Sequence, residues 1–239
     1  FKISPFAWRG WWHYGTGALG DTACHIMDMG YWAMELGSPD WVKGESNGGS
    51  EWSAPINSII EYQFPANDYS GKDGIKYMWY DGYTKATFDR QKWALVKESN
   101  EYNHPSKKTL NGMSFEAFGS CVVGEKGTLY FNRSKDYWVV LPTSAVDGYT
   151  DWPKPSIARA RDKDPHKEWY DAITGKVDQA ESHFGQSGPF TEAILLGCLA
   201  QRAPGEKLEW DSENLEVKGR PEMQPWIKRD YRPGWELTV

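Results

Sequence analysis

The chain has 239 residues, a length that suits one large domain or at most two small ones. Its net charge is −6 and its Lys and Arg residues are scattered, so we expect no nucleic acid partner, because a phosphate-binding face needs clustered cations. No apolar run reaches the roughly 18 residues of a membrane span, so no membrane is expected either. Aromatic residues make up 15% of the chain, a density that suits core packing, a large interface or sugar-stacking surfaces.

The N-terminal part of the chain begins with a loop-like stretch and then becomes helical. Residues 1–17 are rich in Trp and Gly, with an early Pro. From Ala18 to Met34, apolar residues recur at three- and four-residue steps, which predicts a helix. The sequence GSP at 37–39 then predicts where this helix ends.

The middle of the chain has the period-two alternation that is typical of β-strands. The segments that show it are residues 41–46, 56–64, 75–82, 86–96, 115–124, 127–132 and 137–141. The sequence GEKG at 124–127 predicts a tight hairpin between two of them. The polar residues 101–113 predict a long loop.

The C-terminal third becomes helical again. Helical periodicity predicts helices over residues 164–176 and 187–202, the second with Pro189 near its first turn, and residues 206–217 predict a short strand and turn. One helix, consecutive strands and two late helices predict an α+β fold, a large, mostly antiparallel β-sheet with helices on one face. Residues 1–239 are expected to form a single domain, since the sequence has no βαβ alternation and no internal repeat.

The three cysteines Cys24, Cys121 and Cys198 are widely spaced beside apolar residues. Their odd number and surroundings predict buried free thiols rather than disulfides or metal ligands. The first residue is Phe rather than Met, so we expect the chain to begin within a longer protein. The cellular location, cytoplasmic or exported, stays open.

The segment GTGALGDTACHIMD, residues 15–28, carries the strongest constellation of functional side chains. Asp21 and His25 are four residues apart on the predicted helix, so their side chains project from one face. Such a pair can relay a proton, with the imidazole as acid or base and the carboxylate orienting it. Alternatively, Asp21 caps or charges the helix start and His25 is a core histidine. Together with Asp28 they do not indicate a metal site.

Three blocks of sequence carry a family resemblance: WRGWWHYGTGALGDTACHIMDMGYWAMELGSP (8–39), DPHKEWYDAITGK (164–176) and SGPFTEAILLGCLAQRAPGEKLEWD (187–211). They resemble the C-terminal domain of Gfo/Idh/MocA oxidoreductases, in particular a bacterial branch with a WRGWW…GTGALGD…CH block. The resemblance implies a dihydrodipicolinate-reductase-like fold whose sheet commonly forms a dimer interface. It also implies that Asp21 and His25 face the nicotinamide and the substrate, with His25 as acid or base on the reacting hydroxyl.

The chain departs from that family at several points. His13 stands where relatives often carry Asp. No G-x-G-x-x-G follows a strand, because GTGALG at 15–20 follows a Trp-rich loop, and the family's Glu-Lys-Pro segment is missing. We therefore expect the dinucleotide-binding domain to be absent from this chain. NAD or NADP is expected in the complete enzyme, and neither is expected to bind tightly to this chain alone.

Further residues are candidates for binding a substrate. Arg9, Trp12 and Tyr14 precede the motif and could wall a polar pocket, with rings stacking on a sugar, or could pack a domain junction. Tyr80, Asp81 and Tyr83, in the segment MWYDGY at the end of a predicted strand, could hydrogen-bond a polyol or decorate the surface. His183 lies in a Gly/Ser loop that resembles a stretch approaching the active site in relatives.

These observations leave three functional hypotheses. The first is the substrate-binding and oligomerisation domain of an NAD(P)-dependent oxidoreductase that acts on a sugar, inositol or related polyol. The second is an NAD-dependent glycosidase of the same fold, with an oxidation–elimination mechanism. The third is a non-catalytic module that binds carbohydrate or dimerises. In each, we expect a homo-oligomer that forms through the β-sheet.

Overall fold

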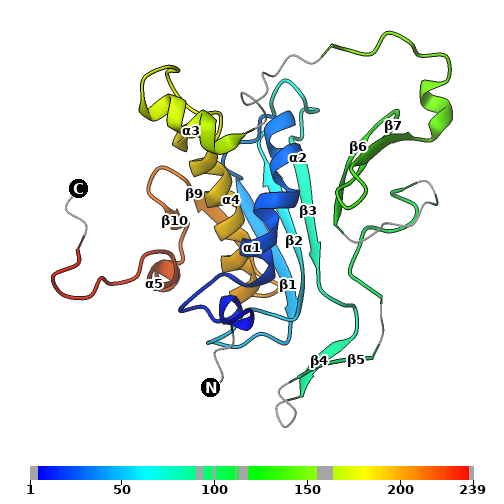
Figure 1. The fold of residues 1–239 in the computed structure, drawn as a ribbon. Helices are drawn as coiled ribbons and strands as arrows, with labels where there is room; N and C mark the ends of the chain where they lie inside the picture. The colour runs from blue at the N-terminus through cyan, green and yellow to red at the C-terminus, as the bar shows by residue number, and fades with distance from the viewer. Residues whose placement is uncertain are drawn as a thin grey trace.

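The computed structural model of the chain describes residues 5–89, 94–98, 101–110, 112, 118–154 and 164–236. The fold is α+β, as predicted (Figure 1). The helices are α1 Gly17–Ile26, α2 Asp28–Ala33, α3 Pro165–Ile173, α4 Phe184–Arg202 and α5 Gln224–Ile227, with 3-10 turns at Ala7–Gly10, Thr143–Val146 and Pro221–Met223. The strands are β1 Trp41–Asn47, β2 Asn57–Phe64, β3 Ile75–Asp81, β4 Ala86–Asp89, β5 Ala94–Lys97, β6 Gly119–Gly124, β7 Gly127–Asn132, β8 Tyr137–Leu141, β9 Lys207–Asp211 and β10 Glu216–Val217.

The main sheet has five strands in the order β10-β9-β1-β2-β3, and each neighbouring pair is antiparallel. Side chains alternate between its two faces, as strand geometry requires. On β2, Ile60, Tyr62 and Phe64 are fully buried, whereas Ile59 and Glu61 between them are only half-buried. The helices α1 and α4 therefore cover one face of this sheet, and Figure 1 shows both on the same side.

The core lies between α4, α1 and the covered face of the sheet. Ala193, Gly197 and Ala200 of α4 are buried there, and Gly197 lets the layers approach closely. A Cβ atom added at Gly197 would lie 1.9 Å from Tyr62 Oη and 2.7 Å from Leu19 Cδ2. No side chain larger than hydrogen fits at this point without displacing the sheet or α1.

The remaining strands form two smaller sheets rather than one extension of the first. β6, β7 and β8 make a three-stranded antiparallel sheet, and the hairpin at residues 124–127 is confirmed by the pairing of Gly124 with Gly127. Figure 1 shows this sheet beside the β3 edge. The five-stranded sheet agrees with the predicted antiparallel sheet that has helices on one face. In the described residues no hydrogen-bonded ladder joins β3 to another strand on its outer side, so the other strands stay separate from it.

Three predicted elements differ in detail. The helix expected over residues 18–34 divides at Met27 into α1 and α2. The strand expected over residues 86–96 is two strands, β4 and β5, paired antiparallel with Asp89 opposite Ala94, and its central residues are polar. α4 begins at Phe184, because His183 caps it: its Nδ1 accepts a hydrogen bond from the Gly185 amide at 3.0 Å.

The three cysteines are free thiols, as predicted, but they are not all buried. Cys198 on α4 is buried and Cys121 on β6 is half-buried, whereas Cys24 is exposed. Cys24 lies on the side of α1 that faces away from the sheet, so its apolar neighbours in sequence do not surround it in space. Of the described helices, none combines the length and the apolar character that a membrane span requires.

We expect Gly197→Ala to destabilise the fold by about 1–3 kcal/mol, because the added methyl group overlaps Tyr62 and Leu19. Urea unfolding measures the change in free energy. The matched control is Gly188→Ala on the same helix, where no atom lies within 4 Å of the added Cβ. Alanine there should be neutral or stabilising, since it is the better helix former. Equal stability of the two variants would contradict this packing.

Candidate functional site

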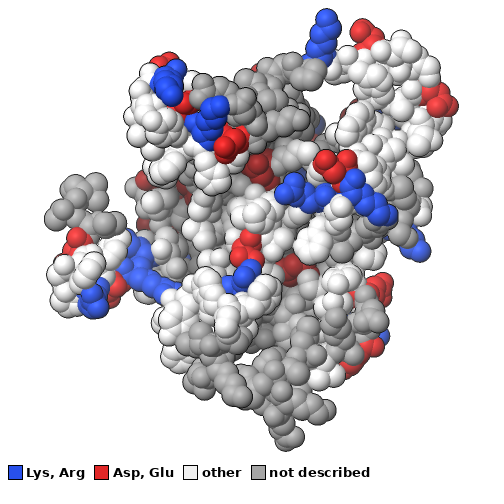
Figure 2. Space-filling view, viewed as in Figure 1, with Lys and Arg blue, Asp and Glu red and all other residues white. Residues whose placement is uncertain are grey.

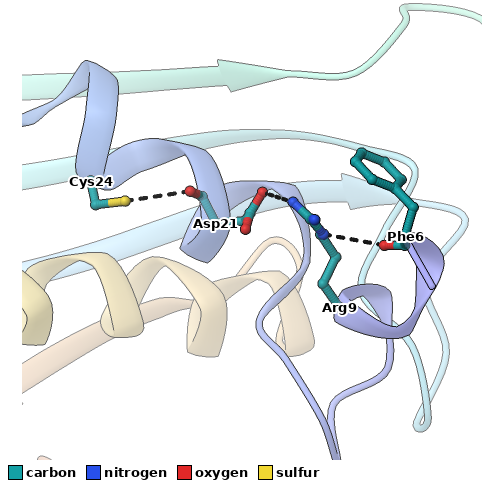
Figure 3. Close-up of polar contacts among 4 residues, drawn as sticks. All are labelled: Phe6, Arg9, Asp21 and Cys24. Carbon is teal, nitrogen blue, oxygen red and sulfur yellow. Dashed lines mark hydrogen bonds and ion pairs between the residues drawn. The ribbon is translucent and has the colours of Figure 1, made fainter.

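The candidate site lies on the outward face of α1. Asp21 and His25 are both exposed, and their i, i+4 spacing puts them on one side of the helix. His25 is therefore not a core histidine. Asp21 makes no helix cap: its Oδ2 accepts instead from the Nη1 atom of Arg9 (Figure 3).

Arg9 is held in place by two further contacts. Its Nε donates to the carbonyl oxygen of Phe6 at 3.2 Å, and its guanidinium carbon lies 4.3 Å from the centroid of the Phe6 ring. Figure 3 shows the side chain reaching from the N-terminal turn to Asp21. The turn Ala7–Gly10 thereby places a positive charge against the first half of α1.

The proton relay predicted between Asp21 and His25 is not a direct contact. Within the described ranges, neither a hydrogen bond nor an ion pair joins the two side chains. The carboxylate of Asp21 still lies one helical turn from the imidazole, which is exposed to a ligand approaching α1. Next to them, Cys24 Sγ donates to the Asp21 carbonyl oxygen at 3.4 Å (Figure 3).

Cys24 is not poised as a nucleophile. Burial raises the pKa of its thiol, and the negative charges of Asp21 and Asp28 raise it further. Burial also raises the pKa of Asp28. A reactive cysteine needs the opposite environment, one that lowers its pKa and favours the thiolate.

The glycines of GTGALG serve packing within the chain. A Cβ at Gly15 would lie 2.6 Å from the Arg9 carbonyl oxygen, and one at Gly17 would lie 2.3 Å from Ala54 Cβ. In a phosphate-binding loop, glycines instead let the backbone approach the phosphate. Close packing within the chain therefore accounts for Gly15 and Gly17.

Two of the other predicted residues, Trp12 and Tyr14, lie on the loop before α1. Trp12 is buried, with its indole Nε1 donating to the Ser50 carbonyl oxygen at 3.2 Å. The guanidinium carbon of Arg202 lies 5.4 Å from its ring centroid. Trp12 thus packs the core, whereas Tyr14 is exposed and available to a ligand.

His183 is not brought together with the α1 residues. It caps the start of α4, which lies beside α3, whereas the N-terminal turn and the start of α1 are at the other end of the molecule (Figure 1). The capping contact gives His183 a structural role. Its loop position in the sequence could not distinguish a cap from a site residue.

Beside α1 lies a cleft of ≈1340 Å³, which runs between α1, α2, β3 and β6. Ligand pockets are commonly about 300–1,000 Å³, so there is room for a sugar or a larger molecule. The lining is mostly apolar, with a few polar groups. The α1 residues that line it are Ala18, Thr22 and Ile26, and the polar groups include Tyr80, Asp81, Asn103, His104 and Cys121.

Asp81, one of the residues that the sequence offered for hydrogen-bonding a polyol, lines this cleft. Its Oδ1 accepts from Ser58 Oγ and its Oδ2 from Trp79 Nε1, both at 2.9 Å. Burial raises the pKa of its carboxyl group, and the hydrogen bonds from Trp79 and Ser58 partly oppose that rise. The signal in the sequence was a single Asp at the end of an alternating strand, before Gly82.

Comparison of the sequence with protein-family models gives no match, and comparison with curated proteins gives none either.

Groups of three or more His, Cys, Asp or Glu side chains suited to a metal ion are absent from the described part of the chain. Figure 2 shows the basic side chains dispersed among acidic ones on the face that carries α1 and α4. The chemistry of the site therefore rests on Arg9, Asp21, His25 and the cleft beside them.

The raised pKa of Asp81 makes its contribution to stability depend on pH. An aspartate has a pKa of about 3.9 in the unfolded chain, and the folded state holds its proton to higher pH. The contribution of Asp81 is therefore greatest at low pH and falls as pH rises through the raised folded pKa.

Asp81→Asn removes this titration. We expect the free energy of unfolding of the wild type, minus that of Asp81→Asn, to fall as the pH rises above about 4, the pKa of an aspartate in the unfolded chain. Urea unfolding at several pH values measures both. A difference that stays constant over this range would contradict the shift.

Proposed function

We propose that this chain is the substrate-binding and oligomerisation domain of an NAD(P)-dependent oxidoreductase that acts on a sugar, inositol or related polyol. The observation that carries the proposal is the arrangement on α1, where an exposed His25 lies one turn from an Asp21 already paired with Arg9. The resemblance of residues 8–39 to Gfo/Idh/MocA enzymes supports the same assignment of roles. The adjacent cleft offers room for the substrate.

In this function the chain's own contribution is proton transfer at the substrate. His25 accepts the proton of the substrate hydroxyl group while the carbon that bears this hydroxyl is oxidised. In the reverse reaction, His25 returns the proton to the oxygen. Asp21 keeps a negative charge near the imidazolium that forms, which stabilises its charged state. Arg9 limits the freedom of the Asp21 carboxylate and holds it on the outward face.

The redox part of the reaction belongs to NAD or NADP held by the dinucleotide-binding domain that the resemblance places before this chain. Arg9 and Ala54 fill the space beside the Cα atoms of Gly15 and Gly17, which supports our proposal that the other domain holds the dinucleotide. The exposure of Asp21 and His25 fits a surface that a second domain covers.

The sheet face opposite α1 and α4 is the surface we propose for oligomerisation. This face carries positive and negative side chains that form ion pairs. Lys76 Nζ lies 2.6 Å from Glu61 Oε1, and Lys207 Nζ lies 3.4 Å from Glu209 Oε1. Half-buried Trp41 and Ile59 lie among these pairs. A surface with both signs of charge and apolar side chains can be self-complementary in a two-fold dimer.

Titration of the chain with NADH, followed by energy transfer from its Trp residues to the nicotinamide, should give no saturable binding up to millimolar NADH. The reason is the filled space beside Gly15 and Gly17. Binding in the micromolar range would contradict it and would make residues 15–20 a phosphate loop after all.

In the complete enzyme, His25→Ala should lower kcat by about 10²–10⁴-fold, the usual contribution of a general acid–base residue. Steady-state kinetics with the oxidisable polyol measures this. His166→Ala on α3 is the matched control, because His166 is also exposed and, among the described residues, its ring contacts Asp164. Turnover of His25→Ala at the wild-type rate would contradict the role of His25 as the general acid–base residue.

A further inference from the structure

The Asp81 carboxylate has hydrogen-bonding capacity that the described residues do not use. Ser58 donates to one oxygen and Trp79 to the other. An ionised carboxylate offers about four acceptor positions. About two therefore remain, and Asp81 lines the cleft beside α1, where a ligand could supply the missing donors.

The hydrogen-bond network around Asp81 consists of groups that donate toward its carboxylate. Gln201 Nε2 donates to Ser58 Oγ at 2.8 Å, and Ser58 in turn donates to Asp81. The Trp79 indole can only donate. Both side-chain partners of the carboxylate thus donate a hydrogen bond to it, which holds Asp81 in the role of acceptor.

Asp81 also lacks a compensating cation. In the described part of the chain, no Lys or Arg forms an ion pair with its carboxylate. A desolvated carboxylate without a cation costs free energy unless further donors reach it.

The backbone around Asp81 is fixed in position. Asn103 Nδ2 donates to the Asp81 carbonyl oxygen and the Asn103 amide donates to the Gly82 carbonyl oxygen, both at 2.9 Å. This ties residues 101–105, which also line the cleft, to the end of β3. A carboxylate on a strand end braced in this way is preorganised for a ligand.

The walls of the cleft indicate what kind of ligand fits. Met29, Met34 and Ile75 contribute apolar surface, while Thr22 and Tyr80 contribute hydroxyl groups. A ligand that has hydroxyl donors on one side and C–H groups on the other matches this combination. Thr22 also follows Asp21 directly, so the cleft begins next to the proposed catalytic residues.

We propose that Asp81 binds a neutral sugar or polyol in this cleft by accepting hydrogen bonds from two neighbouring hydroxyl groups. This inference rests on the proposed function and names the recognition point of its substrate. Asp81 acts as a binding residue here, while proton transfer stays with His25.

The Trp79 indole is the reporter, because its N–H donates to the same carboxylate. The chain is labelled with ¹⁵N-tryptophan, the Trp79 indole resonance is assigned with Trp79→Phe, and myo-inositol, glucose and N-acetylglucosamine are titrated in turn. We expect at least one of them to shift the Trp79 resonance saturably. Asp81→Asn should raise the Kd about 10- to 100-fold, as for loss of a hydrogen bond to a charged group.

Asp211→Asn is the matched control. Asp211 also ends a strand and accepts hydrogen bonds from Glu213 and Asn214, but it does not line the cleft. Its variant should bind the polyol like the wild type. Should Asp81→Asn not fold, deoxy analogues are titrated against the wild type, and the analogue lacking the bound hydroxyl should leave Trp79 unmoved while others still shift it.

Two results would overturn the Asp81 proposal. One is a polyol that saturably shifts other indole resonances but not that of Trp79, and the other is the absence of a shift at any indole. Neither result decides the proposed function, which is judged separately by turnover of the complete enzyme with and without His25. The two ideas can therefore fail independently.

Discussion

The close contact of α4 with the sheet and with α1 at Gly197 sets the geometry of the whole core. Tyr62 from β2 and Leu19 from α1 both occupy the space that a side chain at residue 197 would fill. Because one glycine meets both neighbours, the sheet, α4 and α1 are fixed relative to one another at a single point. Cys198 adds a contact from α4 to the start of α1, where its Sγ donates to the Thr16 carbonyl oxygen at 3.5 Å.

That packing determines which way each side of α1 faces. Leu19 and Ala23 point into the core and are fully buried. Thr22 faces the cleft, and Asp21 and His25 face outward. Because an α-helix has 3.6 residues per turn, neighbouring positions in this short segment face the core, the cleft and the outside of the molecule.

A polar cluster lies under the C-terminal half of α4, next to the apolar core. Gln201, Ser58 and Asp81 form a continuous hydrogen-bonded row, and the Asp81 charge contributes to raising the pKa of Cys198 to about 12. Buried Tyr62 Oη and Gln201 Oε1 have no partner within the described residues. Buried polar groups are costly unless they are satisfied, and Asp81 is the member of this row that lines the cleft.

The sequence alone determined the α+β class, most strand positions and the shared face of Asp21 and His25, because periodicity and i, i+4 spacing are local properties. It could not show that His183 is a helix cap or that Trp12 is core, since both depend on neighbours distant in the chain. The pairing of Asp21 with Arg9 and the division of the strands into three sheets were likewise decided by tertiary structure. The sequence offered Asp81 as one polar residue of MWYDGY, but only folding joined Ser58, Trp79 and Gln201 around it, because desolvation and hydrogen bonding depend on residues that sequence order keeps apart.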